Sequence, residues 1–357
     1  MSVILEAKHI SKNFGLTQAL KDVSVTIDEG EVIGLIGENG SGKSTLSSII
    51  SGVYPQSEGE LTLDGKPYKP ADTLDAQNHG ISMIAQEMGT LPGIKVADNL
   101  FIGKEQLFTK HGVVDRKKMY QEARKALEKI GIDNIHPEDP IIKYSLEERK
   151  LIEVVRALYT NPRIFIVDET TTALSQRGRD IIYQVIKRDK GKAVLFISHD
   201  LEELMEVCSK LIVLRDGVFV AELEKSEFEE EKIKELMVGR KLTGDYYRSD
   251  YDGSYGKEVV LSAEKLYVGD SLKGVSLELH KGEILGIGGL TDCGMHELGK
   301  ALFGNVKPLY GEVKLGNGKK ITSEKQAIKN KIGYVSKNRD QEALILSASI
   351  MENTVLP

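Results

Sequence analysis

Short apolar runs alternate with longer amphipathic stretches along the first 240 residues of the chain. Continuous apolar runs of four or five residues, separated by helical patterns, are typical of parallel strands that are buried on both faces of a sheet. The stretch from about residue 88 to residue 161 is mostly helical in pattern, notably over residues 117–130. We therefore predict an α/β core with a mainly parallel sheet and a helical insert. The expected strands are residues 32–36, 81–85, 164–167, 194–197 and 211–214.

The hydrophobic pattern is repeated later in the chain. Residues 20–43 (LKDVSVTIDEGEVIGLIGENGSGK) align without gaps on residues 272–295 (LKGVSLELHKGEILGIGGLTDCGM), an offset of 252 residues. A repeat of this length indicates two tandem copies of one domain. The intervening segment is rich in Gly, Ser and Asp and has no apolar period, so we interpret it as a linker.

The repeat gives a prediction for the domain boundaries. We expect a first domain over residues 1–238, a linker over 239–258 and a second domain over 259–357. The first copy takes about 240 residues and the second only about 100. The second domain is therefore expected to be partial, either because the gene product is truncated or because this is a fragment of a chain nearer 500 residues.

Composition narrows the class of protein. The chain has 54 acidic against 48 basic residues, a formal net charge of −6, which argues against a nucleic-acid partner because such proteins normally carry a basic face. Its two cysteines, far apart in sequence, suit a reducing compartment without disulfides. The N-terminal residues do not resemble a signal peptide, and no apolar run approaches the ~20 residues of a membrane span. We expect a soluble protein that a partner would have to hold at a membrane.

Residues 37–44 (GENGSGKS) match the pattern G-x-x-x-x-G-K-[ST] completely. An apolar run precedes this segment and a helical pattern follows it, as the motif requires. Its backbone N–H groups would surround phosphates, Lys43 would reach the β- and γ-phosphates, and Ser44 would coordinate Mg²⁺. The alternative is a glycine-rich turn without nucleotide. The motif predicts that ATP and Mg²⁺ bind at Gly37, Glu38, Asn39, Gly40, Ser41, Gly42, Lys43, Ser44 and Thr45.

Polar residues follow three of the expected strands. Asp168 and Glu169 end one, His199 and an aspartate follow another, and Gln86 ends a third. Ligands of parallel sheets gather at the carboxyl ends of the strands. Asp168 would join the Mg²⁺ shell, Glu169 would polarise the attacking water as a general base, and His199 would sense the γ-phosphate. On its own, such an acid pair could merely cap the end of a strand at the surface, and a lone histidine could have a structural role. The spacing leaves open whether Gln86 reaches Mg²⁺ or water.

The order of these motifs resembles the ABC ATPases, once residues 145–149 (SLEER) are placed between Gln86 and the acid pair. More closely, residues 85–105 and 333–357 resemble the tandem ATPases of importers for ribose, galactose and xylose. The resemblance covers nearly the whole chain and includes the tandem arrangement. It implies an ATP-hydrolysing importer subunit for a monosaccharide or a related small polar solute.

The resemblance also implies site residues and partners. Phe14 would stack on adenine, residues 173–175 would form the D-loop, and residues 96–103 would lie near a permease. The expected partners are integral membrane permease subunits and, through them, an extracytoplasmic solute-binding protein. The chain would be peripheral on the cytoplasmic side of the membrane. Its ATPase domains would associate head to tail, so that each ATP lies between one P-loop and the opposite signature segment.

The signature segment departs from the family pattern. It reads YSLEE over residues 144–148, with Glu147 where a glycine normally approaches the γ-phosphate. Two like charges ~4 Å apart repel by about 4 kcal/mol at an effective dielectric constant of 20. Unless Glu147 turns away or is protonated, this signature would disfavour nucleotide. Thr170 also stands where the family usually has proline, a departure that the sequence does not explain.

The second P-loop departs as well. Its end glycines remain, but Met295 and His296 occupy the Lys and Ser/Thr positions, and Lys337 stands at the position of Gln86. A methionine offers neither charge nor donor to a phosphate. Because this P-loop would face the Glu147 signature, both departures fall in one composite site. We predict one hydrolytic and one degenerate site in a complete protein; the alternative is a chain that has drifted throughout.

Two further functions compete with an importer subunit. One is a non-transport ABC ATPase acting in translation or DNA repair. Such proteins usually have two working P-loops and a basic or long charged linker, whereas here the linker is short and the second P-loop is degenerate. The other is an inactive, truncated nucleotide-binding regulator. The second signature would lie beyond residue 357, so we expect the chain alone to bind ATP with weak or absent hydrolysis.

Overall fold

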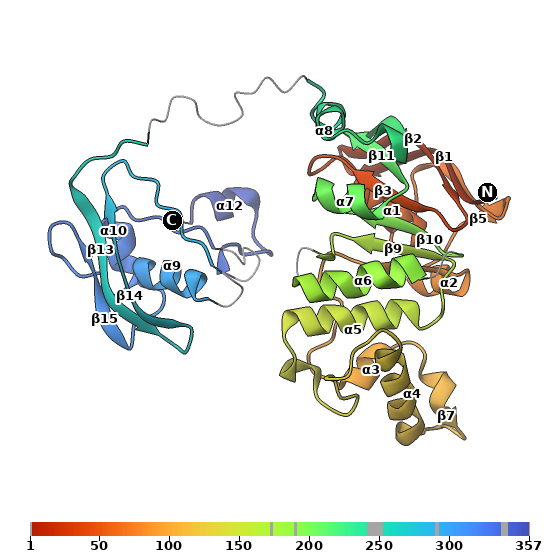
Figure 1. Cartoon of the computed structure of the whole chain (residues 1–357), viewed down its shortest axis with the longest axis horizontal. Coiled ribbons are helices and arrows are strands. Elements are labelled where there is room, and N and C mark those ends of the chain that lie inside the picture. The colour runs from red at the N-terminus through yellow and green to blue at the C-terminus, as the bar shows by residue number, and fades with distance from the viewer. Residues whose placement is uncertain are drawn as a thin grey trace. The chain divides into compact units, whose positions relative to one another are not determined.

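The computed structural model describes residues 2–171, 174–188, 191–240, 253–289, 293–336 and 342–356. The chain folds into two units, Met1–Gly244 and Asp245–Pro357 (Figure 1). The division falls inside the predicted linker, 239–258, of which residues 241–252 lie outside the described part. The two units are described separately below.

A central six-stranded sheet forms the core of the first unit. All its neighbouring strands are parallel except the edge pair β11 and β12, which is antiparallel. The five predicted strands are all present, so the mainly parallel sheet is confirmed. The pattern missed β12 because this edge strand is only partly buried. The strand order is β12 (Val218–Glu224), β11 (Lys210–Arg215), β3 (Val32–Ile36), β10 (Ala193–Ile197), β9 (Ile164–Asp168) and β6 (Ile81–Ile84).

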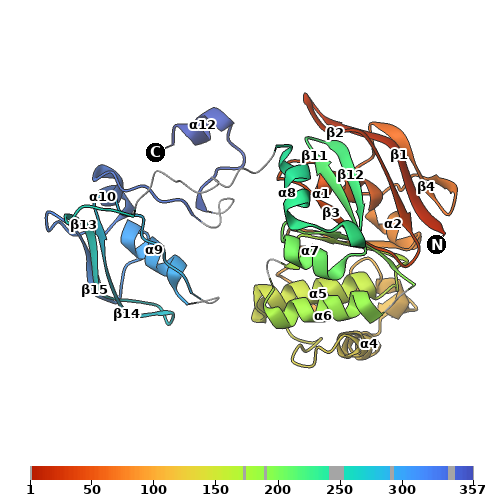
Figure 2. The ribbon, with the colours of Figure 1, turned by 45° about the horizontal axis from the view of Figure 1, so that its top comes forward.

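Both faces of this sheet are buried, which explains the uninterrupted apolar runs. Ile33, Ile166 and Leu195 face a core that includes helix α1 (Lys43–Ile50). Phe165 and Phe196 face the opposite core. Helices α5 (Leu146–Leu158), α6 (Gln176–Arg188) and α7 (Leu201–Val207) cover that second face, and α8 (Glu230–Val238) packs near β11 (Figure 2).

A second, antiparallel sheet packs with α1. Its strand order is β2 (Thr17–Asp28), β1 (Val3–Phe14), β4 (Glu58–Leu63) and β5 (Lys66–Tyr68). The sequence analysis did not predict it, because each strand exposes one side to solvent and lacks a continuous apolar run. A short helix, α2 (Thr73–Asn78), leads from this sheet into β6 and is N-capped by Asp72.

The predicted insert is mostly helical. Ser145 caps α5 in a reciprocal capping box with Glu148, an arrangement that fixes the start of a helix. The insert also holds a short hairpin that the pattern did not indicate. Before α5 its elements are α3 (Val96–Leu100), η1 (Glu105–Phe108), β7 (Thr109–Lys110), β8 (Val113–Val114), α4 (Arg116–Lys129) and η2 (Ile141–Lys143).

The second unit repeats part of the first. Three of its elements lie 252 residues after their counterparts β2, α1 and β4 in the first unit. They are strand β14 (Leu272–His280), helix α9 (Met295–Phe303) and strand β15 (Tyr310–Leu315). The sheet order is β14, β13 (Val259–Val268), β15. Residues 284–288, which correspond to β3, form no strand. In the first unit β3 lies between β10 and β11, and the described part of the second unit has no counterparts of those two strands.

The second unit also contains the short helices α10 (Glu324–Lys329) and α12 (Ile350–Thr354). Its hydrophobic core is small and includes Leu266, Leu298 and Val313. Within the described ranges of the whole chain, no helix combines the length and apolar character needed to cross a membrane.

Candidate nucleotide site

The P-loop is the tight turn between β3 and α1. Gly42 immediately precedes the helix with φ +98°, a conformation that favours glycine. A Cβ atom there would lie 2.6 Å from Leu20 Cδ2 and 2.8 Å from the Ala19 carbonyl oxygen. Only glycine therefore lets the turn pack this closely against β2. The short turn places the N-terminus of α1 directly after the strand.

Lys43 extends back over the P-loop. Its Nζ donates to the carbonyl oxygens of Gly37 (2.9 Å) and Glu38 (3.0 Å), with the Ser41 Oγ at 3.4 Å. Burial lowers the pKa of Lys43, and the nearby charges of Glu169 and Asp168 oppose that shift. Phosphate oxygens are stronger acceptors than these carbonyls because they carry negative charge, so that their hydrogen bonds with an ammonium join two opposite charges. The loop thus holds a cation where the motif predicts the phosphates.

Asp168, at the end of β9, faces the start of α1. Its Oδ1 accepts a hydrogen bond from Ser44 Oγ (3.3 Å) and its Oδ2 one from Ser47 Oγ (3.4 Å). Burial raises the pKa of Asp168, and the hydrogen bond from Ser44 opposes the shift. Hydroxyl and carboxylate oxygens are the ligands that Mg²⁺ prefers, so these residues fit the predicted metal. The sequence analysis missed Ser47, which lies one helical turn after Ser44.

Glu169 and Gln86 lie together. Gln86 Nε2 donates to Glu169 Oε2 over 2.8 Å, and the Glu169 backbone N–H donates to the Ile197 carbonyl oxygen (2.9 Å). Glu169 has φ +43°, a left-handed conformation that is unusual for a residue with a side chain. Such strain at a strand end is a feature of functional sites. Thr170 donates to the Asp168 carbonyl oxygen (3.2 Å), so its hydroxyl stabilises the turn after the strand.

His199 is exposed on the loop between β10 and α7. Ile197 pairs with Asp168 in the parallel register of β9 and β10, so the two strands end level. The structure thus brings His199 to the edge of the sheet that carries the acid pair. A contact with phosphate remains a prediction.

A buried carboxylate that sequence reasoning missed supports both loops. Glu203 accepts hydrogen bonds from Thr171 Oγ1 (2.9 Å), Ser198 Oγ (2.6 Å) and Tyr183 OH (2.5 Å). Thr171 follows the acid pair in sequence and Ser198 precedes His199. Glu203 therefore joins the loops after β9 and β10 to α6. A glutamate on an amphipathic helix gives no sequence signal for such a role.

Phe14 ends β1 with its ring exposed. Tyr54 packs edge-on against it, with ring centroids 5.3 Å apart, and Lys12 Nζ lies 5.0 Å from the Phe14 centroid. The β1–β2 hairpin that carries Phe14 is the one whose Ala19 and Leu20 adjoin Gly42. Phe14 is thus accessible near the P-loop, and its stacking on adenine stays a prediction.

Glu147 contacts its own half of the protein. Ser175, the residue directly before α6, donates from its Oγ to Glu147 Oε1 (2.5 Å). The carboxylate thus turns toward the D-loop segment. This is one of the two ways in which the sequence analysis allowed Glu147 to avoid repelling a phosphate. Residues 172 and 173, which include the first D-loop position, lie outside the described residues.

The second P-loop keeps the turn but not the chemistry. Gly294 has φ +89° and α9 begins at Met295, as Gly42 and Lys43 do in the first copy. His296 follows Met295 within α9. Residues 290–292 of this loop and Lys337 lie outside the described part of the chain.

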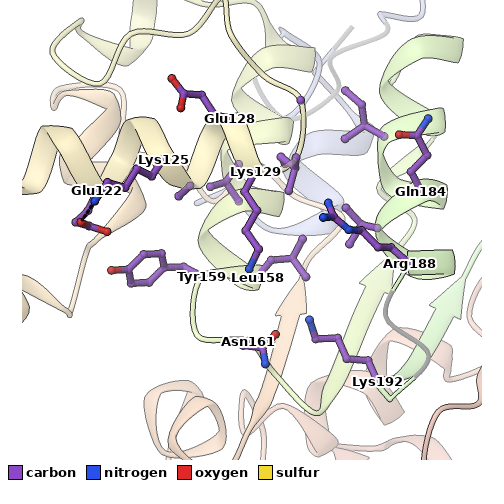
Figure 3. A pocket seen from close by; sticks show the side chains of 16 residues that line it. Glu122, Lys125, Glu128, Lys129, Leu158, Tyr159, Asn161, Gln184, Arg188 and Lys192 are labelled. Carbon is purple, nitrogen blue, oxygen red and sulfur yellow. Dashed lines mark hydrogen bonds and ion pairs between the residues drawn. The ribbon is translucent and has the colours of Figure 1, made fainter.

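A cavity of about 700 Å³ lies apart from these residues, among α4, α5, α6 and the segment before β10. The Lys129, Arg188 and Lys192 side chains extend into it from three different segments (Figure 3). None of the predicted nucleotide-site residues lines this cavity. The cavity and the nucleotide site are therefore separate features of the first unit.

Comparison with known families decides the class of the protein. The model of the ABC transporter family matches residues 20–172 and again residues 272–353. This chain belongs to the ABC transporter ATPase family. The two matched ranges contain the repeated segments recognised in the sequence, residues 20–43 and 272–295.

Curated relatives and solved structures agree with this assignment. The chain is 38% identical to the ribose import ATP-binding protein RbsA of Caldanaerobacter subterraneus subsp. tengcongensis, over all of this chain and 71% of that protein. It is also 38% identical to the protein of that name from Lacticaseibacillus paracasei, over 99% and 70%. The resemblance to ribose-type importer ATPases is confirmed.

Two solved cassettes resemble the fold. A nucleotide-free ATP-binding cassette from an ABC transporter gives a TM-score of 0.58 at 27% identity and covers 66% of this chain and 98% of its own. An ATP-binding cassette in its ADP conformation gives the same score and identity, over 67% and 100%. Because each is covered almost fully by about two thirds of this chain, a single cassette accounts for the first unit.

Proposed function

We propose that this chain is the ATP-hydrolysing subunit of an ABC importer for a monosaccharide or a related small polar solute. The main support is one arrangement: Lys43 in the P-loop, Asp168 bonded to Ser44, and Glu169 bonded to Gln86. The relatives named as ribose import proteins support the solute class. No comparison favours action in translation or DNA repair, or an inactive regulator.

Binding would begin at the P-loop. Its N–H groups and the N-terminus of α1 would contact the phosphates, and Lys43 would leave the carbonyl oxygens for the more strongly charged phosphate oxygens. Phe14 would stack on the adenine. Ser44 and Asp168 would hold Mg²⁺, with Gln86 nearby; the ion would supply positive charge that neutralises the phosphates.

Hydrolysis would depend on side chains at the strand ends. The Glu169 carboxylate would orient the attacking water and take up its proton, while the Gln86 amide fixes that carboxylate. His199 would donate to the γ-phosphate. Lys43 would stabilise charge on the transferred group, which is the main catalytic contribution in phosphoryl transfer.

The family arrangement implies how this chemistry would drive import. ATP would hold two ATPase halves together head to tail, and hydrolysis would release them, moving permease partners on the cytoplasmic side of the membrane. The extracytoplasmic binding protein would supply the solute. The site with Met295 and the Glu147 signature would remain degenerate.

Lys43→Ala provides the first test. We expect the chain to bind ATP and to hydrolyse it slowly, in single-turnover experiments with excess protein and Mg²⁺. Lys43→Ala should lower the hydrolysis rate at least about 100-fold, the scale of losing one charge-stabilising donor, and chelation of Mg²⁺ should also abolish turnover. The control Lys69→Ala changes an exposed lysine and should have no effect. Failure to bind ATP, or hydrolysis that tolerates Lys43→Ala, would refute the proposal.

A further inference from the structure

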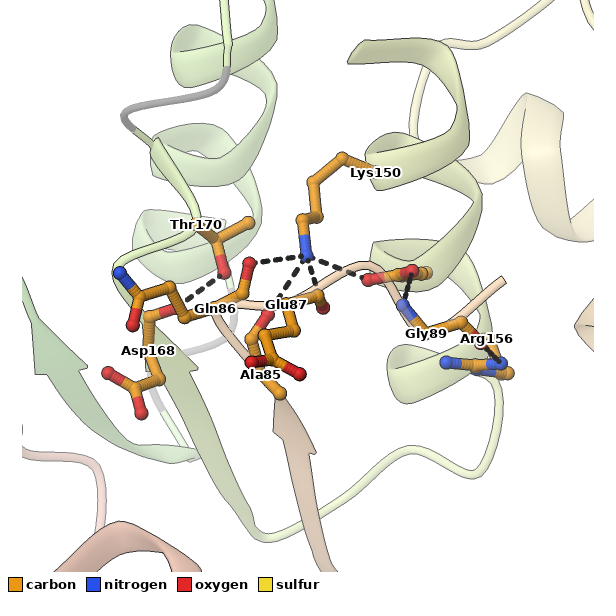
Figure 4. A network of polar contacts seen from close by, with 9 residues as sticks. Ala85, Gln86, Glu87, Gly89, Lys150, Arg156, Asp168 and Thr170 are labelled. Carbon is orange, nitrogen blue, oxygen red and sulfur yellow. Dashed lines mark hydrogen bonds and ion pairs between the residues drawn. The ribbon is translucent and has the colours of Figure 1, made fainter. Parts of the chain in front are cut away.

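Helix α5 carries a buried lysine that neither the motifs nor the proposed chemistry uses. Lys150 is 1% exposed and lies two residues after the signature segment, and its side chain points toward the end of β6 (Figure 4). Buried lysines are rare unless they are paired. The contacts of Lys150 therefore need an explanation.

The ammonium of Lys150 joins α5 to the segment that follows β6. Its Nζ donates to the carbonyl oxygens of Ala85 (2.9 Å) and Glu87 (3.1 Å), with that of Gln86 at 3.4 Å (Figure 4). It also donates to Glu153 Oε2 over 2.9 Å. An ammonium has three protons, so the four acceptors share them. One side chain thus holds three consecutive peptide groups.

Two further charged residues of α5 extend the same contact. Glu153 accepts a hydrogen bond from the Gly89 backbone N–H on its Oε1 (2.5 Å), and Arg156 Nη1 donates to the Gly89 carbonyl oxygen (3.0 Å). Lys150, Glu153 and Arg156 are spaced three residues apart and so lie along one face of the helix. The backbone of residues 85–89 is therefore fixed to α5 by its polar groups.

This segment carries a residue of the proposed site. The backbone of Gln86 is held by Lys150, while its side-chain amide donates to Glu169 Oε2 at the end of β9 (2.8 Å). A continuous set of hydrogen bonds thus runs from the helix of the insert to the carboxylate that would orient water. Any shift of α5 along or across the sheet would move Gln86 with it.

We propose that Lys150 is a positioning residue for hydrolysis. It ties Gln86 to α5, so that the position of the helical insert sets the contact between Gln86 and Glu169. This inference rests on the proposed function. A lysine that only stabilises the fold would instead alter stability without a specific link to Gln86.

The test must avoid an uncompensated buried charge. Lys150→Met alone would leave the Glu153 carboxylate buried without its cation, a change that commonly unfolds domains. The double variant Lys150→Met/Glu153→Gln removes one positive and one negative charge, so no buried charge is left without its partner. The new amide oxygen of residue 153 can still accept a hydrogen bond from the Gly89 backbone N–H. A matched control exists on α4, where Glu122 and Lys125 form an exposed ion pair at the same spacing (2.8 Å). The control is Lys125→Met/Glu122→Gln.

Single-turnover hydrolysis at saturating Mg-ATP measures the positioning role. We expect Lys150→Met/Glu153→Gln to lower the rate about tenfold, the effect of one weakened hydrogen bond in the transition state, with less than a twofold change in Kd for ATP. Gln86→Ala should lower the rate as well, and adding the α5 substitutions to it should cause no further loss. The α4 control should match the unsubstituted chain. The inference would be overturned if the α5 substitutions left the hydrolysis rate unchanged. It would also be overturned if they lowered the rate of the Gln86→Ala variant by the same factor as that of the unsubstituted chain.

Amide hydrogen exchange tests the same contact without any turnover. In Lys150→Met/Glu153→Gln the amides of residues 85–89 should exchange at least about tenfold faster, because opening of this segment no longer breaks the hydrogen bonds of the Lys150 ammonium. The α4 control should leave them unchanged. Unchanged exchange in the α5 variant overturns the inference even in a chain that hydrolyses ATP. Conversely, a chain without Lys43-dependent turnover refutes the proposed function, and the exchange rates still decide whether Lys150 holds the segment.

Discussion

Asp168 suits the P-loop site to a metal–phosphate ligand, but its buried charge lowers the stability of the folded protein when no ligand is bound. Asp168 is 2% exposed, and the hydrogen bonds that its carboxylate accepts from Ser44 and Ser47 are long, 3.3 and 3.4 Å. Burial raises its pKa above the ordinary value of an aspartate, and the charge of Glu169 adds to the shift. Ionised Asp168 therefore costs folding free energy at neutral pH.

Removing this charge should stabilise the ligand-free protein. We expect Asp168→Asn to raise the melting temperature of the first unit by about 2–4 °C at pH 7, the shift that 1 kcal/mol gives in a domain of this size. Because the folded-state pKa is the higher one, the folded state binds a proton more readily than the unfolded state. The contribution of Asp168 to the stability of the unsubstituted chain should thus become less unfavourable as pH falls through the folded pKa, so the advantage of the variant should shrink.

Thermal unfolding from pH 7 down to pH 4 would measure this difference. Asp133→Asn, at an exposed position, is the control for a loss of net negative charge. An advantage of Asp168→Asn that stays constant or widens on acidification would contradict the argument. The same substitution should abolish Mg²⁺-dependent hydrolysis.

At the scale of elements, α5 and α6 are joined where both begin. The Ser175 hydroxyl accepts from the Gly178 backbone N–H (3.4 Å), as an N-cap does, and donates to Glu147. In a capping box the carboxylate comes from the third residue of the same helix. Here that position is Gly178, and the carboxylate comes from α5. A Cβ at Gly178 would lie 2.8 Å from Glu147 Oε1 and 3.1 Å from Leu174 Cβ.

This geometry predicts an unusual response to substitution at Gly178. Alanine in place of glycine normally favours a helix by about 1 kcal/mol, but in Gly178→Ala this gain should be offset, because the new methyl group displaces the Glu147 carboxylate and crowds Leu174. In a Glu147→Gly background the same change should cost less or should stabilise. Urea unfolding of the four proteins in this cycle measures the coupling, which we expect to be about 1 kcal/mol. Equal effects of Gly178→Ala in both backgrounds would show that Glu147 does not occupy this space.

Elements differ in how far the sequence predicts them. The five parallel strands were predictable because burial on both faces leaves uninterrupted apolar runs, and the acids at Asp168 and Glu169 were found because they end such a run. The strands β1, β2 and β4 were missed because each is half exposed. The contacts of Lys150 and Glu203 could not be predicted, since their partners come from distant segments that only the tertiary fold brings together. The orientation of Glu147 depends on Ser175 in the same way.

At the scale of the whole molecule, the two units bury their apolar residues to different extents. The first unit has two cores, one on each face of its central sheet. The described residues of the second form one small core. Ile33 and Leu35 of β3 are fully buried, whereas the corresponding residues of the second unit, Leu285 and Ile287, are 40% and 45% exposed. A unit that buries less apolar surface has less free energy to offset its conformational entropy.

The chain should therefore unfold in two steps, with the second unit first, and nucleotide should separate the steps further. Calorimetry should show two transitions. Mg-ATP at 100 times its Kd stabilises the state that binds it by about 2.7 kcal/mol, which corresponds to a rise of about 5–10 °C for a unit of this size. Because the intact P-loop is in the first unit, only the upper transition should rise. A chain shortened to residues 1–240 should keep the upper transition and its response to ATP. If the lower transition moved with nucleotide, the second unit would have to contribute to the bound site, and the assignment of ATP binding to the first unit alone would fail.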